Sequence, residues 1–130
     1  VNRTAARAQA LVASHAALAS LQKTELLALD IQAPGADFDI IINATASSLE
    51  GAAAPVPASV LRPGSLAYDM MYGPAAQGFL DWAAAHGAQP RDGLGMLVEQ
   101  AAEAFQLWRG QHPPSAQVLQ ELRAAIATGA

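Results

Sequence analysis

Gly93, Met96 and Gln100 have the residue types and the spacing of one wall of a ligand site. Spacings of three and four residues place all three in one row of a helix. A glycine lets a planar ligand approach the backbone, a methionine packs against a ring, and an amide both donates and accepts hydrogen bonds. The row therefore predicts contacts with a planar group and with hydroxyls. The plainer alternative is a packing helix with an incidental glutamine.

The same helix carries a hydrophobic row that predicts how it packs. The members of this row recur at spacings of three and four, as on a face directed to a core. They are Leu94, Leu97, Ala101, Phe105 and Trp108. Positions 93 and 95 do not begin a phosphate-binding G-x-G-x-x-G turn, because Val98 occupies the place of the third glycine. We expect a helix that is anchored by one face and contacts a ligand with another.

Two arginines near the start of the chain are candidates for binding an anion. They belong to the segment Asn2, Arg3, Thr4 and Arg7, where the end of a strand is expected to run into a helix. A helix N-terminus favours negative charge. In a doubly wound nucleotide-binding fold, this place holds an acid for the 2′-hydroxyl of NAD or an arginine for the 2′-phosphate of NADP. The segment contains no acid and so favours NADP, although two solvated arginines are an equally good interpretation.

A second polar cluster, formed by Asn43, Ala44 and Thr45, follows the clearest strand in the sequence, the apolar run at 39–43. Ligands bind just beyond the carboxyl ends of the strands in open parallel sheets. These residues are therefore candidates for contacts with a cofactor. An ordinary cap of the strand by Asn43 explains the same spacing equally well.

The elements that must position these residues alternate between strands and helices. We expect helices at 5–20, 75–86, 94–108 and 115–128, a helical turn at 58–61, a loop at 44–57, and strands at 26–29, 39–43, 65–69 and 88–91. This alternation predicts an α/β fold, with a Rossmann-like parallel sheet and helices on both of its faces.

Composition limits the class of protein. The chain has 7 basic and 11 acidic residues, and the basic ones are scattered, so no nucleic-acid partner is expected. It has no cysteine, and His15, His86 and His112 lack metal-like spacing, so no metal site is expected. A run of apolar residues long enough to cross a membrane, about 18, is also missing. A cytoplasmic enzyme of bacterial type fits these observations.

Four motifs occur in an order that resembles the shikimate dehydrogenase family. They are N-R-T-x-x-R from position 2, I-N-A-T from position 42, Y-D-x-x-Y from position 68 and D-G-L-G-M-L-V-x-Q-A from position 92. The first motif also resembles a segment of glutamyl-tRNA reductases, whereas the C-terminal part of the chain does not. The resemblance implies NADP as cofactor and the reversible reduction of 3-dehydroshikimate to shikimate, a hydride transfer in aromatic amino-acid biosynthesis.

The resemblance also implies roles for individual residues. Those expected to contact the cofactor are Asn2, Arg3, Thr4, Arg7, Asn43, Ala44, Thr45, Met70, Gly93 and Met96, and those expected to contact the substrate are Tyr72 and Gln100. Met70 is expected to line the nicotinamide region, and Tyr72 to approach the substrate. An arbitrary tyrosine is more often a half-buried packing residue. No catalytic residue is expected here, because the family's catalytic Lys–Asp pair lies in an N-terminal substrate domain.

The same resemblance implies that the chain is a C-terminal part of the enzyme. Its only lysine, Lys23, lies in no motif like the catalytic site, and the first Rossmann strand with its glycine-rich turn is missing. Over 1–130 we expect a partial NADP-binding domain that includes the C-terminal helices, is inactive alone and is a candidate for homodimer formation. The alternative is a non-catalytic module that binds NADP weakly or associates with another copy. Use of quinate as well as shikimate stays open.

Overall fold

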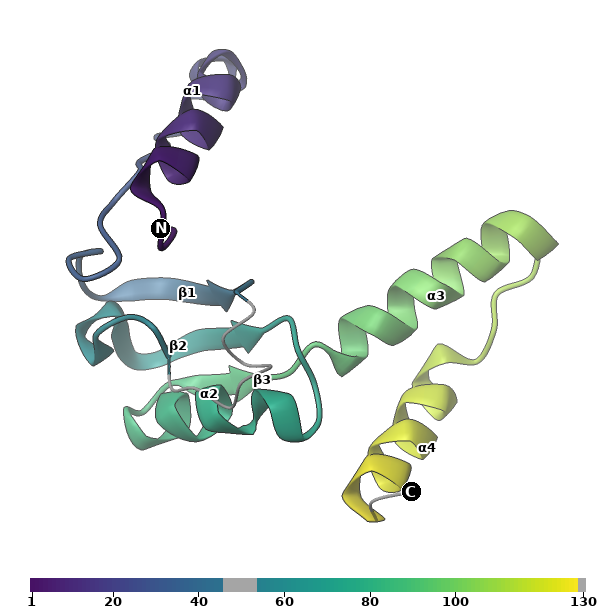
Figure 1. Ribbon diagram of the computed structural model, residues 1–130. Coiled ribbons are helices and arrows are strands. Elements are labelled where there is room, and N and C mark those ends of the chain that lie inside the picture. Colours follow the sequence, from purple (N-terminus) through teal and green to yellow (C-terminus); the bar gives the residue numbers. More distant parts are fainter. Residues whose placement is uncertain (46–53, 129–130) are drawn as a thin grey trace.

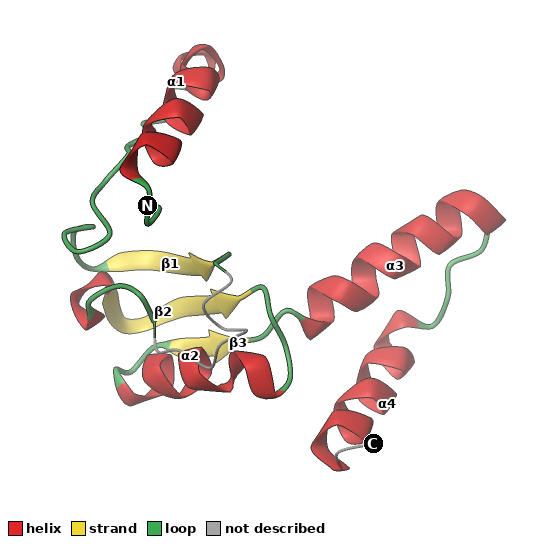
Figure 2. Cartoon of the chain, viewed as in Figure 1, coloured by secondary structure: helices red, strands yellow, loops and turns green. Residues whose placement is uncertain are grey.

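The computed structural model describes residues 1–45 and 54–128. Within these ranges it contains α1 (Ala5–Leu21), β1 (Phe38–Asn43), the short 3-10 helix η2 (Ala58–Val60), β2 (Leu61–Asp69), α2 (Pro74–Ala85), β3 (Gln89–Arg91), α3 (Leu94–Arg109) and α4 (Ser115–Thr128). Strands and helices follow one another along the chain as the sequence predicts (Figure 2). Most predicted bounds are correct to within two residues, but β2 begins four residues earlier than expected.

The three strands form one parallel sheet in the order β1-β2-β3. β1 and β2 are in register from Ile40 opposite Leu66 to Asn43 opposite Asp69, so their last residues lie side by side. Since the strands are parallel, the loops that follow them leave from one edge of the sheet, which is where ligands bind in such folds. The predicted Rossmann-like α/β class is confirmed.

One face of the sheet is covered by α2, which connects β2 to β3 (Figure 1). Phe79 and Ala83 lie one turn apart on α2 and are buried in the same apolar cluster as Ala67 of β2. Ala83 and Ala67 have small side chains, which lets the helix lie close to the strands. The opposite face is more open, because Ile40 and Ile42 of β1 are 58% and 62% exposed.

The other three helices lie beside the sheet (Figure 1). α1 stands beyond the β1 edge and has no buried residue. α3 extends away from the carboxyl edge of the sheet, and α4 runs back beside α3. Arg123 of α4 donates to both carboxylate oxygens of Asp92, at 2.8 and 3.1 Å, and this contact raises the pKa of the guanidinium. The bidentate pair fixes α4 against the start of α3.

The strand predicted at 26–29 is wrong. These residues form no strand in the structure, and Leu26 and Leu27 are 41% and 59% exposed. An apolar run becomes a strand only where a neighbouring strand accepts and donates its backbone hydrogen bonds. Within the described residues the sheet ends at β1, which pairs only with β2.

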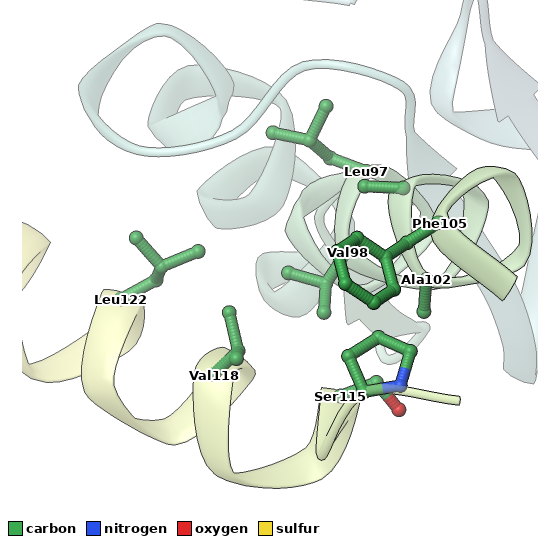
Figure 3. Close-up of a pocket in the computed structure, with 9 residues that line it drawn as sticks. Leu97, Val98, Ala102, Phe105, Ser115, Val118 and Leu122 are labelled. Carbon is green, nitrogen blue, oxygen red and sulfur yellow. The ribbon is translucent and has the colours of Figure 1, made fainter. Parts of the chain in front are cut away.

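The hydrophobic row predicted on α3 is only partly correct. Leu94 is 1% exposed, but the residues buried with it are Val98 and Ala102, and Trp108 is 77% exposed. The other members of the predicted row line a groove between α3 and α4 (Figure 3), namely Leu97, Ala101 and Phe105. The sequence period identifies an apolar side, whereas the neighbouring helix determines which part of that side is buried.

Two further expectations from the sequence concern membrane spans and the loop at 44–57. No helix among the described residues is long and apolar enough to cross a membrane. The loop predicted at 44–57 contains residues 46–53, which lie outside the described part of the chain.

Candidate functional site

The start of the chain and the loop after β1 meet beyond the carboxyl end of that strand. Asn2, Asn43, Ala44 and Thr45 line one pocket of about 210 Å³. The structure thus brings together two segments that lie about forty residues apart in the sequence. Both segments carry predicted cofactor contacts, and they share the edge of the sheet at which nucleotides bind in this class of fold.

The N-terminal segment presents its arginines to solvent at the start of α1. Thr4 is the N-cap residue, but its side chain makes no capping hydrogen bond. Its backbone N–H donates to Oδ1 of Asn2 at 2.9 Å, which closes a short turn before the helix. Arg3 and Arg7 are exposed, and among the described residues neither forms an ion pair. Both guanidinium groups can therefore meet an anion at the positive end of the helix.

Asn43 fixes the first residues after β1. Its side chain is buried, and its amide nitrogen donates to Oδ2 of Asp69 at 3.0 Å. Its amide oxygen accepts hydrogen bonds from the backbone N–H of Thr45 at 3.1 Å and from the hydroxyl of Thr45 at 2.8 Å. The alternative prediction, a strand cap by Asn43, describes this side chain well, because its polar atoms are engaged within the protein.

Asp69 is a site residue that the sequence did not single out. It is fully buried at the last position of β2, where its Oδ1 accepts from the backbone N–H of Met71 at 2.8 Å. Aspartate is almost never fully buried unless it is paired or hydrogen-bonded. A charged residue that ends an apolar strand was the one signal in the sequence that could have identified it.

The start of α3 lies against the loop that follows β2. The backbone N–H of Gly93 donates to the carbonyl oxygen of Met71 at 2.8 Å. A Cβ atom at position 93 would overlap the carbonyl oxygen of Met70. Gly93 has a φ of −80°, which any residue adopts, so the glycine is needed here for space. The structure thus makes Met70 and Gly93 neighbours at the carboxyl edge.

The remaining candidates lie on the loop after β2 and along α3, and they are open to solvent. Met70, Tyr72 and Met96 are 42%, 41% and 37% exposed, and Gln100 is exposed one turn further along α3. Because α3 begins at the carboxyl edge, the row from Gly93 to Gln100 runs outward from that edge (Figure 1). No group of three or more candidate metal ligands occurs in the described ranges.

Known proteins match the chain along its whole length. A family model described as the C-terminal domain of shikimate 5'-dehydrogenase matches residues 93–123. All 130 residues align, at 87% identity, with a shikimate dehydrogenase (NADP(+)) from Acidovorax ebreus strain TPSY. Over all of its residues, the chain is similar to part of a curated shikimate dehydrogenase. It covers 46% of that relative, and so spans about half the length of the curated shikimate dehydrogenases that it matches.

Solved structures show a similarity to the same family. Shikimate 5-dehydrogenase from Thermus thermophilus, in complex with NADP(H) and shikimate, superposes with a TM-score of 0.76 at 31% identity, over 95% of this chain and 44% of that one. A ligand-free 5-ketofructose reductase from Gluconobacter sp. strain CHM43 gives a TM-score of 0.70 at 30% identity, over 95% and 45% of the two chains. The resemblance carried by the four motifs is confirmed.

Proposed function

We propose that this chain forms most of the NADP site and one side of the substrate site of a shikimate dehydrogenase. The full-length enzyme that contains it would reduce 3-dehydroshikimate to shikimate, reversibly, with NADPH. The observation that supports this most strongly is the pocket shared by Asn2 and Asn43–Thr45. Asn2 belongs to the same segment as Arg3 and Arg7, which pair with no acid in the described ranges. The Thermus thermophilus neighbour, which has NADP(H) and shikimate bound, superposes on nearly all of this chain.

The residues present fit the two ends of NADP. Arg3 and Arg7 offer planar guanidinium groups, which bind phosphate in a bidentate manner, and the N-terminus of α1 adds its positive end. At the other end, Gly93 lies against the backbone carbonyl of Met70. The side chain of Met70 is exposed there, and its thioether can pack against a flat ring. The pyrophosphate in the middle of the cofactor has fewer candidate contacts, since the sequence contains no G-x-G-x-x-G turn that would bind it. When bound, NADPH supplies the hydride.

The substrate side is assigned to two polar residues at the same edge. Tyr72 is on the loop after β2, and Gln100 is on α3, and both are exposed. A phenol and a neutral amide can each donate to and accept from the hydroxyls of a polyhydroxylated ring. In this proposal they orient the ring toward the nicotinamide, while the acid–base pair comes from outside the chain.

Steady-state turnover tests the proposed function. The purified full-length enzyme should form NADPH from NADP and shikimate, and should do so faster than from NADP and quinate or from NADP and a ketohexose. The 130-residue chain alone should give no measurable turnover, since a general acid–base residue typically contributes about 10²–10⁴-fold. An enzyme inactive with shikimate but active with the reduced form of 5-ketofructose would refute the assignment.

Gln100→Ala should weaken shikimate binding with little effect on NADP. Loss of one hydrogen bond between neutral groups costs about 0.5–1.5 kcal/mol, which raises the dissociation constant by about 2- to 12-fold. The measurement is a fluorescence titration of the full-length enzyme with each ligand. Gln106→Ala is the matched control, because Gln106 is exposed further along α3. Equal effects of the two substitutions on shikimate would contradict the assignment of Gln100.

A further inference from the structure

One buried carboxylate at the carboxyl edge is shared between two loops. Asp69 is fully buried, and its partner in the register of the sheet is Asn43, the last residue of β1. Its Oδ2 accepts from the amide nitrogen of Asn43 at 3.0 Å, and its Oδ1 accepts from the backbone N–H of Met71 at 2.8 Å. Burying a carboxylate is costly unless donors meet it, so these two donors are strongly held by the charge.

Each oxygen of Asp69 acts on a different half of the site. On one side, the Asn43 amide that Asp69 orients also accepts from the N–H and the hydroxyl of Thr45, which lines the pocket shared with Asn2. On the other side, the residue that Asp69 orients is Met71, which lies between the two site residues of the loop after β2. The carbonyl of Met71 in turn accepts from Gly93 at the start of α3.

We propose that Asp69 is a positioning residue that fixes Asn43–Thr45, at the end of β1, relative to the loop after β2. This inference rests on the proposed function, in which the first loop contacts the cofactor and the second adjoins both the nicotinamide and the substrate. Asp69 has no exposed surface, so it touches neither ligand itself. Its effect on hydride transfer comes from geometry, because a misplacement of about 1 Å between reacting groups can cost about a hundredfold in rate.

Asp69→Asn is the first test, in the full-length enzyme. The new amide group must direct its NH₂ either at the amide nitrogen of Asn43 or at the N–H of Met71, and both are donors. Losing a hydrogen bond to a charged acceptor should raise the Michaelis constants for NADPH and for 3-dehydroshikimate, lowering kcat/KM by about tenfold to a hundredfold. A role in stability alone would lower the melting temperature but leave the Michaelis constants of the folded molecules unchanged.

A double substitution gives a rescue that the geometry specifies. Asn43→Asp alone places two carboxylates in contact and should be as harmful as Asp69→Asn. In the combined variant the amide at position 69 can donate to the carboxylate at position 43, and its oxygen can still accept from Met71. The new carboxylate still accepts both hydrogen bonds of Thr45. The double variant should therefore recover at least about tenfold in kcat/KM over either single variant.

Hydrogen exchange gives a readout that does not depend on turnover. The backbone amides of Thr45 and Met71 should exchange faster in Asp69→Asn and be protected again in the double variant. Asp81→Asn is the matched control, since Asp81 is exposed on α2 and accepts a hydrogen bond from Gln77. It should change neither kcat/KM nor the exchange rates of Thr45 and Met71 by more than about twofold.

The results separate the two proposals. An active wild type whose Michaelis constants and amide protection are unchanged in Asp69→Asn overturns the positioning role. A double variant no better than the single ones overturns it too. If the wild type does not oxidise shikimate, the proposed function fails, while the exchange rates of Thr45 and Met71 still decide whether Asp69 holds both loops.

Discussion

Arg3→Asp in the full-length enzyme is expected to lower kcat/KM for NADPH by about a hundredfold and to change that for NADH by less than about tenfold. Arg3 is exposed at the N-terminus of α1 and forms no ion pair among the described residues, so its guanidinium is available to the 2′-phosphate. The substitution removes a charge-assisted hydrogen bond and places a carboxylate beside the phosphate. NADH lacks this phosphate, and an acid at this place can accept from its 2′-hydroxyl.

Arg109→Asp is the control for the change of charge. Arg109 is also exposed, but it ends α3, far along the chain from the N-terminal segment. Reversing its charge costs about 0.3–1 kcal/mol of stability at a helix C-terminus, without altering the preference between cofactors. If Arg3→Asp and Arg109→Asp reduced kcat/KM for NADPH and NADH to the same extent, the 2′-phosphate would have to be bound by other residues.

Gly93→Ala should destabilise the protein by about 1–3 kcal/mol and reduce turnover as well. The added Cβ would overlap the backbone carbonyl of Met70, which cannot rotate away as a flexible side chain can. Either α3 or the loop after β2 must move, and the hydrogen bond from Gly93 to Met71 would be distorted. Because Met70 is assigned to the nicotinamide region, the displacement should appear in the Michaelis constant for NADPH. Urea unfolding and steady-state kinetics measure the two effects.

Gly95→Ala separates this crowding from the general effect of alanine. Within the described part of the chain, nothing lies within 4 Å of a Cβ built at Gly95, two residues further along the same helix. Replacing a glycine by alanine inside a helix stabilises it by about 0.5–1 kcal/mol where the space is free. The two substitutions should thus change the free energy of unfolding in opposite directions. A loss of stability at both positions would mean that the start of α3 does not tolerate alanine for a reason other than the carbonyl of Met70.

Elements with strong local signals could be predicted from the sequence. The apolar run in β1 and the helical periods of α2 and α3 gave bounds within two residues of those observed. The end of α2 is marked by Gly87, whose φ of +77° favours glycine. The meeting of the N-terminal segment with the loop at Asn43–Thr45 also follows from a parallel sheet, whose functional edge collects the ends of the strands.

The errors occur where distant neighbours decide the structure. The apolar residues at 26–29 form no strand because no second backbone lies beside them in the described part of the chain. On α3 the sequence period showed an apolar side, but burial beyond Leu94 continues at Val98 and Ala102 and not along the predicted row, because α4 lies beside the helix. The ion pair of Arg123 with Asp92 fixes α4 there. Neither arrangement is encoded in local propensity.

Asp69 shows why the site could be predicted only in part. The motif Y-D-x-x-Y drew attention to the residues after the strand, and the aspartate within it had no assigned role. Its function depends on the register that places Asn43 opposite Asp69, and a single-residue slip would direct these side chains to opposite faces. Residues that bind a ligand directly are recognisable by type and spacing, whereas a residue that holds others in place becomes visible only with its partners.

A crystal structure of the full-length enzyme with NADP and shikimate bound would test the central claim most directly. The account predicts the 2′-phosphate within hydrogen-bond distance of Arg3, the nicotinamide ring against Met70 and Gly93, and the amide of Gln100 on a hydroxyl of shikimate. A cofactor whose adenosine end lies away from the N-terminus of α1, or a nicotinamide that does not reach the junction of Met70 and Gly93, would contradict it.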